Sequence, residues 1–510
     1  MRHTLEQTLT EALQSSGIDL HGEPLSFHAP NQSDHGDYAT AIAFRLAKVL
    51  KQAPAQIAEH FIQALQPAMA SQATLSQING FINITLHPSA RLMQIATPAN
   101  YPIKPRRILL EFVSANPTGP LHIGHGRWAV LGSCLAHLLR AVGHTVTTEN
   151  YINDAGNQIE LFIASIVAAK AGNPIPDNGY HGDYIYTIAH CDEDPVTHML
   201  DQHASDLSAI GTHFDHWFRE HTLHTGDTLS DALAHIKAHC YTQDSAVWFK
   251  STAFGDDKDR VLVKSDGSLT YFAVDIAYHW NKIQRHYDQL INIWGADHHG
   301  YVPRVSAAVQ ALQNGHSPTE LTVIIGQLVS LVRNGEPVRM SKRSGDMIYF
   351  RDVIDDIGPD ATRFFLIYKS SDSPIELDLN LANQKTAENP IFYIQYAHAR
   401  ICQLLLKVGV PPDVDITQIA DAYTDADRPL LQCLMHYPDT LLDAANAYEP
   451  HQLANYSLEL ARHFHRFYET NPVLTSTGIQ KAYRLWVIAQ VQRTLQTVLG
   501  ILGISAPTRM

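Results

Sequence analysis

One segment, residues 108–149, narrows the possible folds of this chain more than any other part of it. An apolar strand is expected at 108–113, and a turn rich in glycine and proline leads from it into a helix from about Arg127 to Arg140. A second strand follows at 145–149. Strand, helix and strand form a βαβ unit, whose helix N-terminus presents unpaired backbone N–H groups and the positive end of its dipole. The segment therefore predicts a parallel sheet with an anion site at its carboxyl edge.

Two histidines, His122 and His125, flank Gly124 in that turn. Imidazole N–H groups can donate to phosphate oxygens, and a glycine lets a nucleotide lie against the backbone because it has no Cβ. In a chain with 30 histidines such a pair also arises by chance, so an ordinary turn is the alternative. The residues expected to hold ATP here are Pro117, Gly119, His122, Gly124 and His125.

A basic loop at 339–345 favours the phosphate site over the ordinary turn. It reads Arg-Met-Ser-Lys-Arg-Ser-Gly and follows an expected strand at 321–325 and a turn at 334–335. Small, flexible residues and cations near the carboxyl edge of a parallel sheet can reach the β- and γ-phosphates of a nucleotide. We therefore expect Met340, Ser341 and Lys342 to join the ATP site.

A third polar stretch, 295–300, follows a largely apolar strand that is expected at 291–294. It reads Gly-Ala-Asp-His-His-Gly and therefore places polar side chains in a glycine-bounded turn at the end of a strand. A solvent-exposed turn is the alternative. We expect Gly295, Asp297 and His298 to contact ATP.

Together these motifs resemble the two signatures of class I aminoacyl-tRNA synthetases. The HIGH sequence is His122-Ile-Gly-His125 here, and the KMSKS loop is 339–343. Four further stretches are similar to those of arginyl-tRNA synthetases, namely 35–38, 114–125, 389–400 and 506–510. The resemblance spans nearly the whole chain. It implies a ligase that activates L-arginine with ATP to arginyl-adenylate and pyrophosphate, and then transfers arginine to the terminal adenosine of tRNA(Arg).

The resemblance also implies catalytic roles for three residues. His122 and His125 would donate to phosphate oxygens, and Lys342 would neutralise the leaving pyrophosphate. Mg²⁺ is expected with the nucleotide, held mainly by phosphates and water.

No covalent nucleophile is required. The five cysteines are scattered without CxxC spacing, so neither a disulfide framework nor a protein-bound zinc is expected.

Selection of arginine requires carboxylates, because the guanidinium is a permanent planar cation. Glu111 lies inside an apolar strand, where an unpaired carboxylate costs on the order of several kcal/mol unless a cationic ligand arrives. The alternative is a partly exposed Glu111 paired with Arg106 or Arg107. If a helix begins at Tyr271, its phenol and the carboxylate four residues later share a face. By resemblance, the asparagine at 116 holds the backbone of arginine and Tyr271 its side chain. The expected arginine-binding residues are Glu111, Ser114, Asn116, Tyr271 and Asp275.

Three domains are expected, with an overall α/β fold class. Residues 1–100 read as an N-terminal α/β domain and 101–345 as a Rossmann-like catalytic core with an insertion at about 157–243, while 346–510 is almost wholly helical in pattern. The resemblance implies that the first domain contacts the tRNA elbow and that the last helices bind the anticodon. The expected tRNA contacts are His35, Tyr38, Tyr393, Tyr396 and Met510, with aromatic stacking on unpaired bases as the mechanism and core packing as the alternative.

The net charge of −14 does not exclude RNA, because phosphate contacts require only a local stripe of Lys and Arg. The chain has no apolar run of membrane-spanning length and no signal-peptide pattern at its start, so the cytoplasm is expected. A monomer is expected by resemblance only. Two positions depart from the family pattern: Arg339 replaces the first lysine of KMSKS, and Thr508 replaces a glutamate in the final motif.

Two alternatives to an arginine-specific synthetase stay open. One is another class I synthetase or a HIGH-bearing nucleotidyltransferase. The carboxylates Glu111 and Asp275 and the long helical region 346–510 argue against it. The other is a non-catalytic RNA-binding paralogue, which both histidines and Lys342 argue against.

Overall fold

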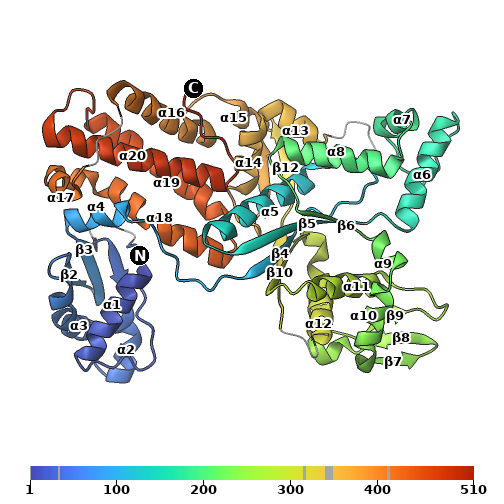
Figure 1. Ribbon diagram of the computed structural model, residues 1–510, viewed down its shortest axis with the longest axis horizontal. Coiled ribbons are helices and arrows are strands. Elements are labelled where there is room, and N and C mark those ends of the chain that lie inside the picture. The colour runs from blue at the N-terminus through green and yellow to red at the C-terminus, as the bar shows by residue number, and fades with distance from the viewer. Residues whose placement is uncertain (1, 31, 33–34, 314–317, 339–347, 410–413) are drawn as a thin grey trace.

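The computed structural model describes residues 2–30, 32, 35–313, 318–338, 348–409 and 414–510. In Figure 1 an N-terminal part lies at the lower left, C-terminal helices lie above it, and a central sheet carries two further lobes on the right. Among these residues, no helix combines the length and the apolar character needed to cross a bilayer.

The central sheet contains five parallel strands in the order β11-β10-β4-β5-β6. Their bounds are, in that order, Glu320–Gly326, Gln289–Gly295, Arg107–Glu111, Thr145–Ile152 and His216–Arg219. In the middle strand β4, Ile108, Leu109 and Leu110 are all buried, as expected where helices cover both faces of a sheet. Because the strands are parallel, their carboxyl ends lie along one edge, which is where α/β folds bind ligands.

Helix α5 (Ile123–Ala141) packs on one face of this sheet, and α11 (Tyr271–Gln284) and α12 (Val302–Leu312) pack on the other (Figure 1). The contact of α5 is close: a Cβ at Gly132 would come within 2.1 Å of the Phe112 ring. The expected βαβ unit is therefore confirmed, and a glycine permits its tight helix packing.

Helix α5 begins at Ile123, earlier than the expected start near Arg127. His122 is its N-cap: Nδ1 accepts from the backbone N–H groups of Gly124 (3.1 Å) and His125 (3.4 Å). In return, Nδ1 of His125 accepts from the N–H of His122 at 3.3 Å. The two imidazoles thus satisfy donors that a helix N-terminus otherwise leaves unpaired. Histidine is not among the usual capping residues, which is why the sequence pattern places the helix start too late.

The expected single insertion at 157–243 is not continuous. Strand β6 lies inside that stretch and pairs with β5, so it belongs to the central sheet. The chain instead leaves the sheet twice. Before β6 come the three helices of the upper right lobe, α6 (Asn157–Lys170), α7 (Asp183–Ala189) and α8 (Pro195–Ala209). After it come the elements of the lower lobe, α9 (His221–Thr225), α10 (Thr228–Ile236), β7 (Cys240–Gln243), β8 (Ala246–Phe249) and β9 (Arg260–Val263).

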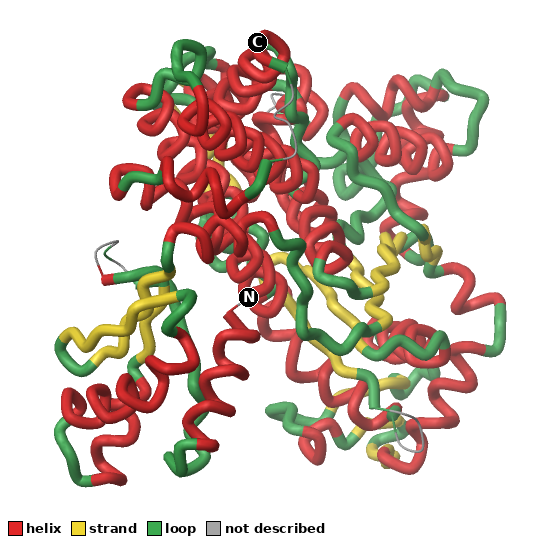
Figure 2. The backbone as a smooth tube through the Cα atoms, turned by 60° about the vertical axis from the view of Figure 1, so that its left-hand side comes forward, coloured by secondary structure: helices red, strands yellow, loops and turns green. Residues whose placement is uncertain are grey.

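The N-terminal part has its own apolar core and its own antiparallel sheet in the order β1-β3-β2, which Figure 2 shows apart from the central strands. Its elements are α1 (Arg2–Ser15), β1 (Tyr38–Thr40), α2 (Ile42–Leu50), α3 (Pro54–Met69), β2 (Ala73–Ile78), β3 (Phe81–Leu86) and α4 (Pro88–Ala96). Asp37 and Arg91 form a fully buried ion pair within it, at 2.7 Å.

The C-terminal part is a helical bundle joined to the part that contains the central sheet by a second, small sheet. Its helices are α13 (Phe350–Ile357), α14 (Pro359–Ile367), α15 (Leu379–Asn383), α16 (Pro390–Val408), α17 (Ile416–Ile419), α18 (Arg428–Ala447), α19 (His451–Thr470) and α20 (Gly478–Ile501). One strand interrupts the expected run of helices: β14 (Ile375–Asp378) pairs in parallel with β12 (Val329–Arg333), which also pairs with β13 (Glu336–Pro337). The domain limits at 100 and 345 stay predictions.

Candidate active site

A pocket opens where β4, β5 and β10 end and α5 begins. It brings together ten of the expected ATP- and arginine-binding residues from segments far apart in the sequence: Glu111, Ser114, Asn116, His122, His125, Tyr271, Asp275, Gly295, Asp297 and His298. Pro117 and Gly119 lie in the loop that leads from β4 to α5. The parallel sheet explains this convergence, because strands that start far apart in the chain end at the same edge.

The two histidines form one rigid unit at the wall of this pocket. Their rings stack with centroids 3.7 Å apart. Both Nδ1 atoms accept backbone N–H groups, so a neutral ring carries its proton on Nε2. Gly124 is required for this arrangement, because a Cβ there would lie 2.9 Å from the His122 ring. In the neutral form, each ring therefore carries its one donor, Nε2–H, near the N-terminus of α5.

Asp275 and Tyr271 lie on the pocket side of α11, as their spacing predicts. The phenol of Tyr301 donates to Oδ2 of Asp275. Burial, together with the neighbouring carboxylates Glu111 and Glu220, raises the pKa of Asp275 to about 7. The described site thus contains a carboxyl group that changes charge near neutral pH.

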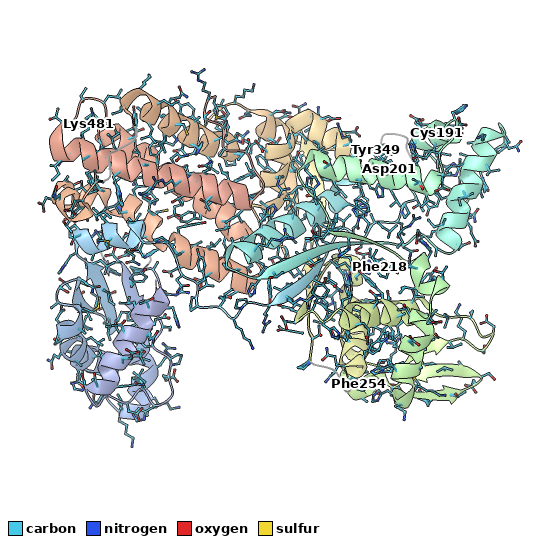
Figure 3. The ribbon with its side chains drawn as sticks, in the orientation of Figure 1. Cys191, Asp201, Phe218, Phe254, Tyr349 and Lys481 are labelled. Atoms are coloured by element: carbon cyan, nitrogen blue, oxygen red, sulfur yellow. The ribbon has the colours of Figure 1, made fainter. Side chains whose placement is uncertain are left out.

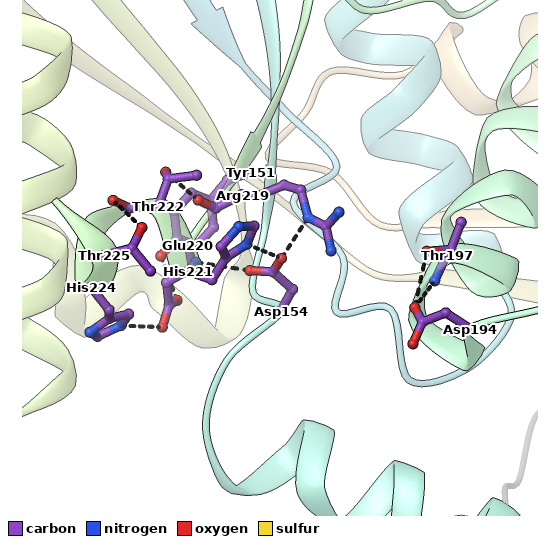
Figure 4. A network of polar contacts seen from close by, with 10 residues as sticks. All are labelled: Tyr151, Asp154, Asp194, Thr197, Arg219, Glu220, His221, Thr222, His224 and Thr225. Atoms are coloured by element: carbon purple, nitrogen blue, oxygen red, sulfur yellow. Dashed lines mark hydrogen bonds and ion pairs between the residues drawn. The ribbon is translucent and has the colours of Figure 1, made fainter.

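Glu220 is a pocket residue that sequence analysis missed. It follows β6 directly and is 7% exposed, and its carboxylate accepts from the phenol of Tyr151 at 2.5 Å. Nε2 of His224 lies 3.5 Å from its other oxygen, as Figure 4 shows. No local pattern marks this glutamate, because its position depends on β6 joining the sheet.

Glu111 is not the unpaired carboxylate that the sequence suggested, nor is it paired with Arg106 or Arg107. Its Oε2 accepts from the ammonium of Lys282, whose side chain is fully buried, and its Oε1 accepts from the hydroxyl of Ser114 at 2.8 Å. Arg106 instead pairs with Glu320. Lys282 was missed, although it lies eleven residues after Tyr271, on the same face of α11.

The loop after β4 is held in a strained conformation. Val113 and Ser114 have φ values of 72° and 46°, in the left-handed region that branched side chains rarely adopt. The backbone N–H of Ser114 donates to Oδ1 of Asn150 at 3.0 Å, which fixes this turn. Asn116 in turn donates to the side-chain oxygen of Gln158 at 2.6 Å. The strain occurs where the loop lines the pocket.

Tyr38 was expected to contact tRNA, and the structure corrects this expectation. It is 2% exposed, and its hydroxyl accepts from Gln94 at 2.7 Å and donates to Asp439 of α18 at 3.3 Å. A base cannot stack on a ring that is buried between the N-terminal part and α18. His35, three residues earlier, lines a separate pocket on the N-terminal part.

Tyr393 and Tyr396 lie on α16, and both rings contact His465 of α19, with centroids 4.6 and 5.9 Å away. Tyr396 is 42% exposed, and Met510 at the chain end is 55% exposed. Met340, Ser341 and Lys342, expected in the ATP site, lie outside the described residues, as does Arg339.

Within the described ranges, no group of three or more His, Cys, Asp or Glu side chains could hold a metal ion. The sequence also contains two adjacent histidine–cysteine pairs, His190-Cys191 and His239-Cys240, and these lie in different lobes. In Figure 3 Cys191 is at the upper right, whereas Phe254, whose ring packs 5.0 Å from that of His239, is in the lower lobe.

Comparisons with known proteins agree with this arrangement along the chain. The model of the arginyl tRNA synthetase N terminal domain matches residues 3–86, that of the class I (R) tRNA synthetase catalytic domain matches 90–176, and that of the DALR anticodon binding domain matches 394–510. An arginine–tRNA ligase of Frankia alni is 41% identical over 94% of this chain and 94% of its own length. Another, of Geobacillus thermodenitrificans, is 37% identical over 100% and 99%.

The chain belongs to the arginyl-tRNA synthetase family.

Solved structures of arginyl-tRNA synthetases share the fold. A putative arginyl tRNA synthetase from Campylobacter jejuni superimposes with a TM-score of 0.72, at 34% identity over 83% of this chain and 98% of that chain. The Thermus thermophilus arginyl-tRNA synthetase gives a TM-score of 0.82 over 100% of both chains; at 23% identity this match concerns the fold alone. The expected family and the expected α/β class with a helical C-terminal domain are confirmed.

Proposed function

We propose that the pocket at the carboxyl edge of β4 and β10 activates L-arginine with ATP, and that the chain then transfers arginine to tRNA(Arg). The observation that carries this proposal is that two carboxylates bonded to phenols, Asp275 and Glu220, share a pocket with the stacked pair His122 and His125. One part of the pocket suits a guanidinium and the other suits phosphates.

The guanidinium of arginine is assigned to Asp275 and Glu220. Two other carboxylates nearby are already paired with cationic side chains. Glu111 forms an ion pair with Lys282, and Glu149 accepts hydrogen bonds from both terminal nitrogens of Arg285, at 2.6 and 2.9 Å. A phenol leaves the negative charge of its carboxylate uncancelled, and a guanidinium can then pair with it strongly in a partly buried site. Tyr271, 76% exposed, covers the side chain of the substrate.

Ser114 and Asn116 are assigned to the amino and carboxylate groups of arginine. Both lie on the loop between β4 and α5, so the substrate carboxylate would lie beside the phosphate site. Activation joins that carboxylate to the α-phosphorus of ATP and expels pyrophosphate. The task of the protein is to align the two groups and to stabilise charge as it develops.

ATP is assigned to the first turn of α5 and to the end of β10. Nε2–H of His122 and His125 donates to phosphate oxygens, and Gly124 permits close approach. The turn with Gly295, Asp297 and His298 lines the same pocket as the two histidines. Lys342 neutralises the leaving pyrophosphate, and Met340 and Ser341 are assigned to ATP beside it. Mg²⁺ accompanies the nucleotide through phosphate and water ligands, which requires few donors from the chain. The monomeric state stays a prediction from the resemblance, and the cytoplasmic location stays a prediction from the sequence pattern.

Transfer to tRNA uses surfaces outside the pocket. Tyr393 and Tyr396, with His465, offer aromatic rings on α16 and α19, and His35 and Met510 lie on the N-terminal part and at the chain end. Stacking of unpaired bases on such rings suits recognition of a tRNA loop.

The decisive test is aminoacylation with each of the twenty amino acids, using total tRNA, ATP and Mg²⁺, beside pyrophosphate exchange with and without tRNA. We expect charging with arginine only. Charging with another amino acid would contradict the assignment of Asp275 and Glu220, and tRNA binding without charging would favour a non-catalytic paralogue. Citrulline, which is arginine with a neutral side-chain terminus, should compete poorly with the unmodified protein and better with Asp275→Asn.

A further inference from the structure

A buried lysine lies directly beneath the proposed arginine pocket. Lys282 has no exposed side-chain surface; its Nζ donates to Glu111 and, at 2.9 Å, to Oδ1 of Asn292, and it lies 4.3 Å from the ring centroid of Tyr278. Asn292 is the cross-strand partner of Glu111 in the central sheet, which places both acceptors under the same end of α11. Burying an ammonium costs desolvation free energy that ion-pair and hydrogen-bond partners must offset, so a buried lysine at this position calls for an explanation.

Hydrogen bonds extend from this lysine toward both sides of the pocket. On one side, Glu111 accepts from Ser114. On the other, Nδ2 of Asn292 donates to Nε2 of His279 at 3.1 Å, and Nδ1 of His279 donates to the backbone carbonyl of Asp275 at 2.8 Å. Burial, with Lys282 nearby, lowers the pKa of His279 to about 3, so its ring is neutral and can accept from Asn292. The loop after β4 and the first turns of α11 are thus joined through one ammonium.

The same ammonium decides where negative charge remains in the pocket. Other charged and titratable groups lie near the Lys282–Glu111 pair. They come from β5, from the residue after β6, and from α11 with the residue that follows it: Glu149, Tyr151, Glu220, Asp275, Tyr278, His279 and Arg285. Arg285 balances Glu149, and Lys282 balances Glu111. Asp275 and Glu220 are thus pocket carboxylates bonded to phenols, with the imidazole of His224 3.5 Å from Glu220, and their charge is available to a cationic ligand when they are ionised.

We propose that Lys282 is a positioning residue that sets how the pocket distinguishes the two ends of arginine. Its ammonium cancels the charge of Glu111 beside Ser114, where the substrate carboxylate lies, and leaves the carboxylates of Asp275 and Glu220 to pair with the guanidinium. This inference rests on the proposed function, because it takes arginine as the substrate.

The test compares arginine with agmatine, which is arginine without its carboxylate, used as a competitive inhibitor. Lys282→Met leaves Glu111 without its cation, and the resulting charge repels a carboxylate but not the amine of agmatine. We expect the ratio of the agmatine Ki to the arginine KM to fall by at least about tenfold. A like charge a few ångströms from the substrate carboxylate in a partly buried site should weaken the binding of arginine by at least that factor. The KM for ATP should stay within about twofold.

A charge-compensating variant separates this role from general support of the fold. Lys282→Met combined with Glu111→Gln removes both charges, so the ratio should return to within about threefold of the unmodified protein. The kcat should be reduced in both the single and the double variant, because a methionine cannot donate to Asn292. Arg91→Met is the matched control: it breaks an equally buried ion pair, with Asp37 in the N-terminal part, and should lower the Tm without changing the ratio.

An unchanged ratio in Lys282→Met would overturn the proposal. If that single variant does not fold, the double variant decides: a near-native ratio with reduced kcat supports the proposal, and a native kcat overturns it. Charging by the unmodified protein is measured first. If it does not charge arginine, the proposed function fails, whatever the lysine variants do.

Discussion

The imidazole rings of His122 and His125 stack with their centroids 3.7 Å apart, and each ring accepts a backbone N–H through Nδ1. These histidines therefore have two roles in the proposed mechanism. Their Nδ1 atoms cap α5, and their Nε2 atoms are assigned to ATP. Substitutions can separate the two roles, because some side chains cap a helix without reaching a phosphate.

His122→Asn should keep the helix cap and lose the donor to phosphate. We expect arginine activation to fall by about 10²–10³, as for removal of a preorganised donor, with little change in Tm. His122→Ala should lose the same activity and about 1 kcal/mol of stability in addition. Pyrophosphate exchange and thermal unfolding are the measurements. Equal Tm values for the two variants would contradict the capping role, and native activity in His122→Asn would contradict the phosphate role.

The pKa of about 7 at Asp275 predicts pH-dependent binding of arginine. Because burial and the neighbouring carboxylates favour the protonated form, the free protein holds a neutral Asp275 below that pH and a charged one above it. Only the charged form pairs with a guanidinium, so the arginine KM should fall between about pH 6 and about pH 8 and level off above.

Two variants check that this dependence belongs to Asp275. Tyr301→Phe removes the phenol that stabilises the carboxylate, so the midpoint should move to higher pH. Asp275→Asn should raise the arginine KM and abolish the dependence. A dependence that persists in Asp275→Asn would assign the titration to another group.

Tyr38→Phe should act on stability and not on base stacking. The phenol is buried and bonds to Gln94 and Asp439, and loss of a buried hydrogen bond costs about 1 kcal/mol. Denaturant unfolding should show this loss, while the affinity for tRNA(Arg) should stay unchanged where both proteins are folded. Weaker tRNA binding with unchanged stability would contradict burial of Tyr38.

Tyr396→Ala is expected to show the opposite behaviour. The ring is 42% exposed on α16, so its removal should change stability by no more than about 0.5 kcal/mol. If it stacks on an unpaired base, binding of tRNA should weaken by about 1–3 kcal/mol. Filter binding with tRNA(Arg) and with an unrelated tRNA distinguishes this contact from a general loss of affinity.

Gly132→Ala tests the close approach of α5 to the sheet. A Cβ there would lie 2.1 Å from Phe112, so the helix must shift and stability should fall by about 1–3 kcal/mol. Gly500→Ala in α20 is the matched control, because no atom of the residues that the structure describes lies within 4 Å of that Cβ, and it should raise stability by up to about 1 kcal/mol. Similar Tm shifts in the two variants would contradict this packing.

Much of the catalytic core could be predicted from local sequence. The βαβ unit, the spacing of Tyr271 and Asp275 on one helix face, and the helical C-terminal part follow from apolar periodicity and turn residues. The start of α5 could not, because its cap is a histidine, and no local pattern showed that β6 pairs with β5.

What the sequence by itself determined is the family, the α/β class and ten residues that line one pocket, because motifs and periodicity are local properties of the chain. The tertiary structure alone decided which charges are balanced and which remain. Lys282 and Glu111 are 171 residues apart, and Tyr38 is buried against a helix whose Asp439 is 401 residues away in the sequence. A side chain is buried or paired by whatever the fold brings next to it, and that information is not contained in its sequence neighbours.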